Sequence, residues 1–288
     1  MFEFASTAKP VEQAPIGLLA GHGRFPIIFA QKARQLGIPL VCVGLQDEAS
    51  PELAALADRF YWTGIAKLGR TIRCFKREGV RQIVMAGKLH KVKLNASFRI
   101  LRYLPDLRML RAYFFQPRKD NKDNTLLLAY MAEFEKDGMS FASALDFCPE
   151  LLVKTGILTR RGLSAPEEAD VAFGWEMAKE MGRLDIGQSV CVREKAVLAV
   201  EAIEGTDQAI LRAGMLCPRG GIVVVKVAKP QQDMRFDVPT IGCTTIESMR
   251  QAHARVLAIE ADRTIVIDQD QTVALADRYG ITIVARAA

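Results

Sequence analysis

The sequence predicts an α/β protein made of two domains, the first of them built on a parallel sheet. Short apolar runs alternate with helical patterns along most of the chain, as they do when helices connect parallel strands. The 288 residues also exceed the ~150 of a typical single domain. Between residues 151 and 165 the pattern loosens around glycines and arginines, which is typical of a linker. We therefore expect a leader over 1–14, an N-terminal domain over 15–150 and a C-terminal domain over 166–288.

The N-terminal domain begins with a βαβ unit. A buried strand over 16–20 leads through a glycine loop into a helix over 27–36, and a second buried strand follows over 39–45. Strand, loop, helix and strand within about 30 residues predict a right-handed crossover. A helix over 65–78 and a strand over 82–86 extend the pattern. The domain is therefore predicted to be Rossmann-like.

Gly21, His22, Gly23 and Arg24 follow the first strand, where a dinucleotide-binding loop would lie. The glycines would let backbone N–H groups approach a phosphate at the start of the helix. Pro26 takes the place of the third glycine of that fingerprint, so only half of the motif is present. The loop predicts nucleotide or phosphate binding in general, and a nicotinamide cofactor is the alternative.

Gly87 and Lys88 end the strand over 82–86 in a similar way, and a basic segment follows them. From Lys88 to Lys119 the chain carries nine Lys or Arg residues against one acid, Asp106. Leucines and aromatics lie between these cations at helical spacing. This pattern predicts an apolar face with a rim of cations, which suits anionic lipid or an acylated substrate. A pair of amphipathic helices packed on the sheet explains the pattern equally well. Nucleic acid is not expected, because the chain lacks an RNA-binding signature.

The polar stretch from Lys119, which includes Asp123 and Asn124, is predicted to open a helix that runs to about Lys136, with Asn121 or Asp123 as its cap. Capping of the helix would alone explain Asp123. The same carboxylate would also suit a site that faces phosphates through a metal. The sequence leaves both roles open.

The C-terminal domain is predicted to mix helices, a hairpin and buried strands. Ser164 and Glu167 have the spacing of a capping box and begin a helix that ends at Gly182. Two apolar runs around a tight turn predict a hairpin over 189–203. The later elements are expected in this order: a helix from 208, a strand from 222, a helix over 245–259, a strand over 264–268, a helix to 280 and a strand over 281–284.

Residues 226–242 directly follow the strand from 222, so their polar groups should lie at a strand end. Three cations there could hold phosphoryl oxygens, namely Lys226, Lys229 and Arg235. Asp233 or Asp237 could bind a divalent cation or orient water. A solvated turn with its charges facing water is the alternative interpretation. A second polar stretch, Glu204 to Asp207, also suits a cation or a hydroxyl-bearing ligand, although a bare turn would contain the same residues.

The composition predicts a soluble, intracellular protein. No run of about 18 apolar residues occurs, and the first residues lack a basic start followed by an apolar stretch. The six cysteines are scattered without Cys-x-x-Cys pairs or flanking histidines. We therefore expect buried thiols rather than a zinc site.

The chain also carries motifs that resemble those of a known family. They are Ile16-Gly-Leu-Leu-Ala-Gly-x-Gly-x-x-Pro26, Ala86-Gly-Lys88, Gly182-Arg-Leu-Asp-Ile-Gly-Gln188, Leu198-Ala-Val-Glu-Ala-x-Glu-Gly-Thr-Asp207 and Lys229-Pro-x-Gln-x-x-Arg-x-Asp-x-Pro-Thr-Ile-Gly242. Together they resemble the LpxI family, the UDP-2,3-diacylglucosamine pyrophosphatases of lipid A biosynthesis. The resemblance extends from about Pro15 to the C-terminus, and the last two motifs are specific.

This resemblance implies a Rossmann-like N-terminal domain, a distinct C-terminal α/β domain and a lipid-linked site between them. It implies hydrolysis of the diphosphate of UDP-2,3-diacylglucosamine to UMP and 2,3-diacylglucosamine 1-phosphate (lipid X). The expected cofactor is Mg²⁺, with Mn²⁺ as an alternative ion. The expected location is the cytoplasm, peripherally at the surface of the inner membrane, and a homodimer is compatible with the resemblance.

In the family, the aspartate of the Arg-x-Asp-x-Pro-Thr-Ile-Gly motif is the residue most tied to catalysis, and it falls on Asp237. We expect Asp237 with Asp207 to hold the metal or position water, and Lys229 and Arg235 to neutralise phosphate oxygens. Substrate-binding residues are expected on loops of both domains: Gly21, His22, Gly23, Arg24, Gly87, Lys88, Asp123, Glu204, Thr206 and Thr240. The family often has a triple glycine at 21–23 and an Asp-Asp pair at 123–124, so Asn124 offers a metal only a neutral oxygen.

Two other functions stay open at this point. A non-catalytic nucleotide or lipid carrier would use the same cleft and bind its ligand without magnesium-dependent turnover. A nicotinamide-dependent oxidoreductase would bind nicotinamide and show no preference for uridine. Release of UMP from the diacylated UDP-sugar separates the pyrophosphatase from both.

Overall fold

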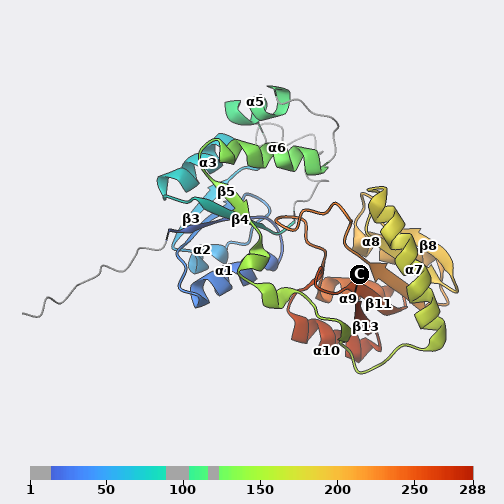
Figure 1. The fold of residues 1–288 in the computed structure, drawn as a ribbon. Helices are drawn as coiled ribbons and strands as arrows, with labels where there is room; N and C mark the ends of the chain where they lie inside the picture. Colours follow the sequence, from blue (N-terminus) through green and yellow to red (C-terminus); the bar gives the residue numbers. More distant parts are fainter. Residues whose placement is uncertain (1–13, 89–103, 116–122, 288) are drawn as a thin grey trace, which may run out of the picture. The chain divides into compact units, whose positions relative to one another are not determined.

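The computed structural model describes residues 14–88, 104–115 and 123–287. The chain forms two compact units that divide after Phe147, and each is described by itself (Figure 1). The predicted leader over 1–14 lies outside the described residues except for its last residue. Of the basic segment from Lys88 to Lys119, residues 89–103 and 116–119 also lie outside them. Within the described helices, none is long and apolar enough to cross a membrane.

The N-terminal unit is a parallel sheet covered by helices on both faces. The sheet has the order β3-β2-β1-β4-β5. Its strands are β1 (Ile16–Ala20), β2 (Leu40–Leu45), β3 (Arg59–Thr63), β4 (Gln82–Ala86) and β5 (Ser140–Ala142). Its helices are α1 (Phe25–Gln35), α2 (Leu53–Leu56), α3 (Leu68–Arg77), α5 (Leu107–Phe115) and α6 (Asp123–Glu135).

The layers of this unit follow from apolar strands that are buried on both sides. All residues of β1 and β2 are buried, as expected for central parallel strands. In Figure 1, α1 and α2 cover one face, α3 and α6 cover the other, and α5 packs outside them. The predicted α/β class and the strands over 16–20 and 82–86 are confirmed. The sequence did not reveal β3 and β5, which lie at the two edges of the sheet.

The C-terminal unit contains a mixed sheet of six strands in the order β6-β13-β11-β9-β7-β8. These are β6 (Gly156–Ile157), β7 (Ser189–Arg193), β8 (Ala196–Val200), β9 (Ile222–Lys226), β11 (Ala254–Glu260) and β13 (Thr282–Arg286). A separate pair joins β10 (Thr240–Ile241) to β12 (Ile265–Val266). Thus residues 151–165, expected as a linker, contribute β6 to this sheet through its pairing with β13.

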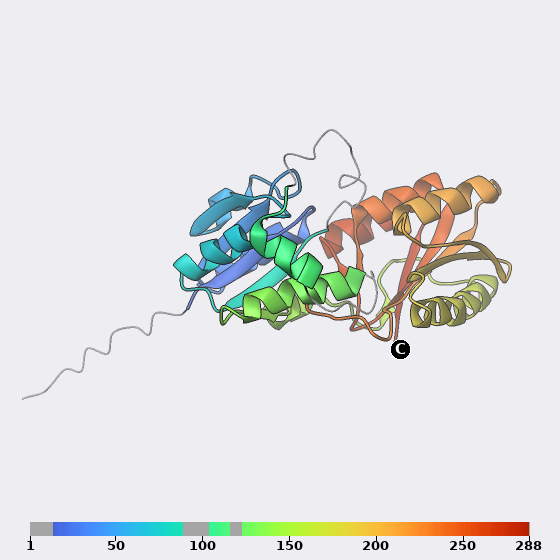
Figure 2. The same ribbon diagram turned by 90° about the horizontal axis from the view of Figure 1, so that it is seen from above.

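Helices cover both faces of this second sheet (Figure 2). They are α7 (Ala165–Arg183), α8 (Thr206–Leu216), α9 (Cys243–Gln251) and α10 (Gln269–Tyr279). One core joins α7 to Val190, Val223 and Val225, and the other joins α8, α9 and α10 to the opposite faces of the same strands. The predicted hairpin and the helix that opens with a capping box are confirmed.

The predicted helix over 245–259 is wrong in its second half. The helix α9 ends at Gln251, and β11 takes the following residues into the centre of the sheet between β9 and β13. Because β11 is buried on both faces, its apolar residues do not alternate with polar ones. Its alanines, leucine and glutamate also favour a helix when the sequence is considered alone. Packing in the sheet overrides this local preference.

Candidate active site

In the N-terminal unit, the loops that follow β1 and β4 are joined backbone to backbone. The His22 N–H donates to the Lys88 carbonyl oxygen at 2.8 Å, and the Lys88 N–H donates to the His22 carbonyl oxygen at 2.8 Å. These strands are neighbours at the point where the strand order reverses. Open α/β sheets commonly bind ligands at this position, outside the carboxyl ends of the strands. The predicted residues from Gly21 to Arg24 are thus brought together with Gly87 and Lys88.

This junction also limits how the glycine loop could hold a phosphate. The Gly21 N–H donates to the Ala86 carbonyl oxygen at 2.9 Å, so the amides of Gly21 and His22 are both used within the unit. Gly87 adopts φ +97°, and a Cβ there would lie 2.8 Å from the His22 carbonyl oxygen, so only glycine fits. The exposed side chains of His22, Arg24 and Lys88 remain as the groups that a ligand could meet.

In the C-terminal unit, residues 182–188 hold the loop that follows β9. Lys229 Nζ lies 2.8 Å from Asp185 Oδ1. The Lys229 N–H donates to Gln232 Oε1 at 2.8 Å, and Gln232 Nε2 donates to Gln188 Oε1 at 3.3 Å. Two of the sequence motifs, which are 41 residues or more apart along the chain, therefore form one structure. The loop is therefore held in place by side-chain contacts and is not a freely solvated turn.

Asp237 lies on this loop beside the two lysines. Its backbone N–H donates to the Asp233 carbonyl oxygen at 3.0 Å, which holds the segment in a turn. Partial removal of the Asp237 carboxyl from water raises its pKa, although the residue remains exposed to solvent. Lys229, a hydrogen bond from Gln232 and then Lys226 act against this rise, and nearby Glu201 adds to it. Asp237 is thus accessible to a substrate and close to positive charge.

A buried polar network lies at the same end of the sheet as this loop. Lys226 ends β9, is only 4% exposed and donates to Thr206 Oγ1 at 2.6 Å. Thr206 in turn donates to Glu201 Oε1 at 3.0 Å and lies 3.3 Å from Ser189 Oγ. Ser189 is opposite Lys226 in the pairing of β7 with β9. The network therefore spans three neighbouring strand ends.

Two carboxylate oxygens of this region are buried without a hydrogen-bond partner among the described residues. They are Glu201 Oε2 and Asp207 Oδ1. A buried acceptor without a partner costs about 1–3 kcal/mol, so such atoms commonly face a ligand. Within the described ranges, no group of three or more acidic, histidine or cysteine side chains could by itself hold a metal. Mg²⁺ needs only one or two carboxylates when substrate phosphates complete its shell, so either of these carboxylates suits such an ion.

Gly187 brings residues 182–188, which we call the supporting loop, against this network. A Cβ at this position would lie well inside van der Waals contact of the Glu201 carbonyl oxygen. The Glu201 N–H donates to the Ser189 carbonyl oxygen at 2.8 Å, so the same stretch also fixes Glu201 by its backbone. The chain can approach this closely only because residue 187 has no side chain.

Three other predicted residues have partners of their own. Arg235 forms a two-point ion pair with Asp233, with Nη2 at 2.6 Å from Oδ2, and this contact lowers the pKa of the Asp233 carboxyl. Glu204 pairs with Arg212 at 2.5 Å. Thr240 donates its hydroxyl to the Val238 carbonyl oxygen at 2.9 Å. A phosphate at Arg235 would have to compete with Asp233. The side chain of Asp123 lies outside the described residues.

The network contains residues that were not predicted as part of the site. Glu201, Asp185 and Gln232 belong to the motifs noted above, but nothing in their spacing indicates which side chains meet. The available signal for Glu201 was a single acid inside the apolar run over 196–203, which was predicted as one strand. That pattern does not predict a buried carboxylate with one oxygen unpaired.

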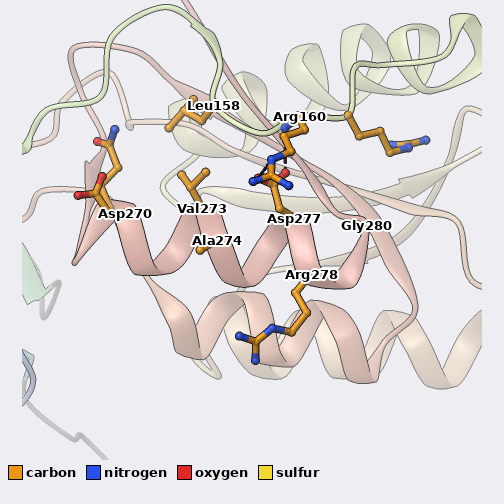
Figure 3. A pocket seen from close by; sticks show the side chains of 10 residues that line it. Leu158, Arg160, Asp270, Val273, Ala274, Asp277, Arg278 and Gly280 are labelled. Carbon is orange, nitrogen blue, oxygen red and sulfur yellow. Dashed lines mark hydrogen bonds and ion pairs between the residues drawn. The ribbon is translucent and has the colours of Figure 1, made fainter.

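Two hollows of the C-terminal unit are lined by none of the predicted site residues. The larger, about 610 Å³, lies between α10 and the segment around Arg160 (Figure 3). There the Arg160 N–H donates to Asp277 Oδ1 at 2.8 Å, and Arg278 projects from the other side of α10 (Figure 3). The smaller, about 430 Å³, is lined by arginines near Tyr279. Neither hollow contributes to the network around Lys226.

Comparisons with known proteins cover almost the whole chain. Residues 15–151 match the family model of the LpxI N-terminal domain, and residues 154–284 match that of the LpxI C-terminal domain. The UDP-2,3-diacylglucosamine pyrophosphatase LpxI of Caulobacter vibrioides is 32% identical over 280 residues, which covers 93% of this chain and 96% of that protein.

Two solved biotin carboxylase structures show only a weak likeness to this chain. The biotin carboxylase subunit of pyruvate carboxylase gives a TM-score of 0.27 at 15% identity, covering 66% of this chain and 36% of that one. The biotin carboxylase domain of Hydrogenobacter thermophilus 2-oxoglutarate carboxylase gives 0.26 at 14% identity, covering 71% and 41%. Scores this low carry no argument about function. The matches to the two domain models and to the relative from Caulobacter vibrioides show that this chain belongs to the LpxI family.

Proposed function

We propose that this chain hydrolyses the diphosphate of UDP-2,3-diacylglucosamine to UMP and 2,3-diacylglucosamine 1-phosphate. The observation that carries the proposal is the accessible carboxylate of Asp237 beside Lys226 and Lys229, at the end of β9. The curated relative named for this activity is 32% identical over nearly its whole length, which supports the same substrate here. The chain is accordingly a hydrolase that acts on a phosphoric anhydride.

The reaction adds one water across the anhydride. The water oxygen forms a bond to one phosphorus, the bond from that phosphorus to the bridging oxygen breaks, and the two phosphate esters separate. The diphosphate is anionic, so its charge must be neutralised while the water is aligned opposite the breaking bond. Lys229 would serve the phosphate oxygens, and Lys226 holds Thr206 and its neighbours in place. Asp237 would orient the water and accept its proton, a role suited to a carboxyl whose pKa is raised.

The unpaired oxygens of Glu201 and Asp207 would be ligands for a divalent cation, and the charge of Glu201 also acts on the Asp237 carboxyl. When bound, Mg²⁺ or Mn²⁺ would neutralise charge on the diphosphate oxygens. This assignment keeps Asp207 as a predicted ligand and adds Glu201, because its free oxygen is buried and needs a partner.

The remaining parts of the substrate are assigned by the chemistry that would recognise them. The exposed His22, Arg24 and Lys88, at the strand-order reversal of the N-terminal sheet, would take the uridine nucleotide. Leu184, Ile186 and Ile203 are exposed on the two loops that carry the network, and they would favour the diacylated half. A substrate with two acyl chains resides in a bilayer, so we place the enzyme peripherally at the inner-membrane surface.

Product analysis tests this function. The purified protein is incubated with UDP-2,3-diacylglucosamine, with Mg²⁺ or with excess EDTA, and the products are identified by mass spectrometry. We expect UMP and 2,3-diacylglucosamine 1-phosphate in equal amounts, formed only with the metal. Tight substrate binding with no products would instead support the carrier, and binding of a nicotinamide nucleotide without uridine preference would support the oxidoreductase.

A further inference from the structure

Arginines of the C-terminal unit are paired with carboxylates almost everywhere, and the exceptions gather in one region. Of the twelve arginines in this unit, nine form ion pairs: Arg160, Arg161, Arg183, Arg193, Arg212, Arg235, Arg250, Arg263 and Arg286. The side chains of Arg219, Arg255 and Arg278 form no ion pair or hydrogen bond with any described residue. All three line the two hollows around the turn from α10 into β13.

Arg219 and Arg255 line the smaller hollow, of about 430 Å³, together with Arg250 and His253. We call this hollow, which these four residues help to line, the arginine hollow. No carboxylate is among its described lining residues. The charge of Arg250 is partly offset, because its Nη1 lies 3.6 Å from Glu247 Oε2 and its guanidinium stacks 4.7 Å from the centroid of the Tyr279 ring. The guanidinium groups of Arg219 and Arg255 therefore face the hollow without a counter-ion, and the His253 imidazole lines it beside them.

The arginine hollow is distinct from the candidate active site. It is lined by Gly221, Ala254 and Ile281, which lie at the amino ends of β9, β11 and β13. Lys226 and the loop with Asp237 follow the carboxyl end of β9. A strand of five residues separates its two ends by roughly 15 Å at about 3.3 Å per residue. A ligand in the hollow would not occupy the active site.

The chemistry of the hollow favours a phosphate ester. Unpaired like charges around a concave surface repel one another and raise the local concentration of anions. Guanidinium groups match phosphate oxygens with two parallel hydrogen bonds, which a carboxylate-paired arginine cannot offer. The volume also lies within the ~300–1,000 Å³ of small-molecule sites.

We propose that the arginine hollow binds a small soluble phosphate monoester. Its phosphate dianion lies between Arg219 and Arg255, and its organic part lies against Tyr279. A lipid headgroup carries the same phosphate chemistry, but the hollow is concave and lies at the opposite end of the sheet from the residues proposed to take the lipid substrate. A soluble ligand is therefore the occupant that the geometry fits.

Amide spectra of the full-length ¹⁵N-labelled protein test the proposal, with phenyl phosphate and inorganic phosphate as the probes. Both probes are expected to shift the backbone signals of Gly220, Gly221 and His253 in a saturable way, and phenyl phosphate is expected to bind more tightly. The double variant R219A/R255A should weaken this binding at least ~10-fold, as expected when two charge-assisted contacts to a phosphate are lost. The charge-matched control K154A/K195A should bind as the wild type does.

Three outcomes would overturn the proposal. One is the absence of saturable shifts at Gly220, Gly221 and His253 in the wild type, a result that needs no variant. The second is equal affinity in R219A/R255A and K154A/K195A. The third is that only vesicles of phosphatidylglycerol, and neither soluble probe, perturb these signals, which would assign the surface to a membrane. Shifts at the Asp237 loop report binding at the active site and are followed separately.

Discussion

At the scale of single residues, buried charge is concentrated where β9 ends. Lys226 and Glu201 are 4% and 8% exposed, and both bond to the Thr206 hydroxyl. Groups so removed from water need partners, yet Glu201 Oε2 has none among the described residues. A protein that retains such an atom gives up stability, which is typical of sites that a ligand completes.

Replacement of Glu201 by glutamine tests this interpretation. Glu201→Gln keeps the shape of the side chain but removes its charge, so we expect turnover to fall by about 10²-fold, comparable to the loss of one electrostatic contact to a transition state. The concentration of Mg²⁺ needed for half-maximal activity should rise, and direct binding of Mn²⁺ measured by electron paramagnetic resonance should weaken. The control is Glu194→Gln in the exposed hairpin turn. Equal Mn²⁺ affinity in the two variants would remove Glu201 from the cation site.

Glu167 gives a pH-dependent prediction. Burial raises the pKa of its carboxyl, but hydrogen bonds from Ser164 and the ion pair with Arg161 outweigh this and leave the pKa lowered. The charged form therefore stabilises the fold above the ordinary carboxyl range, and this contribution is lost as the pH falls through the lowered value. Glu167→Gln should cost about 1 kcal/mol at pH 7. Urea unfolding at pH 7 and pH 3 checks this, because the difference from wild type should shrink on acidification; a difference that is constant with pH would contradict it.

Which residues of the site could be predicted depended on their neighbours in sequence. Asp237 and Lys229 lie on the loop that directly follows Lys226, so their proximity followed from the chain itself. The contact of Lys229 with Asp185 joins residues 44 positions apart, and no local pattern indicates it. The same holds for the unpaired oxygen of Glu201, since only the packed structure reveals that water is excluded from it.

At the scale of elements, the supporting loop at 182–188 depends on a close approach to the end of β8. Gly187→Ala would push a methyl group into the Glu201 carbonyl, and relief of this overlap must separate the two segments. We expect a loss of about 1–3 kcal/mol in unfolding free energy, as for overpacked cores, together with lower turnover because Glu201 moves.

Gly162→Ala is the matched control for this change, because a Cβ at residue 162 meets nothing within 4 Å. Thermal unfolding and UMP release are measured for both variants. If Gly187→Ala were as stable and active as Gly162→Ala, the supporting role assigned to the loop would be wrong.

Element prediction succeeded where local and tertiary preferences agree. The central strands β1 and β4 and the hairpin of β7 and β8 have apolar runs between clear turn signals, and they formed as expected. The failure at 245–259 has the opposite cause, because Ala254 to Glu260 combine helix-favouring residues with a strand that is buried at every position except Arg255. The His253 backbone at φ +52° marks the break, which the sequence does not signal because histidine rarely adopts this conformation.

At the scale of the whole molecule, the C-terminal unit has its own core on each face of its sheet. We therefore predict that a fragment of residues 148–288 folds alone and unfolds in one cooperative transition. It should bind Mn²⁺ but release no UMP, because the loops proposed to take the nucleotide lie in the N-terminal unit. Circular dichroism with heating measures folding, and full turnover by the fragment would show that the N-terminal loops are not needed.

The central claim is that Asp237 acts on the diphosphate, and the rate of UMP release by Asp237→Asn measures it most directly. The variant is compared with wild type at pH 7 under saturating Mg²⁺ and substrate, after thermal unfolding has shown both to be folded. We predict that UMP release falls by at least ~10³-fold, as when a group acting only in the transition state is lost, while substrate still binds. A folded Asp237→Asn protein that releases UMP at the wild-type rate would contradict the account.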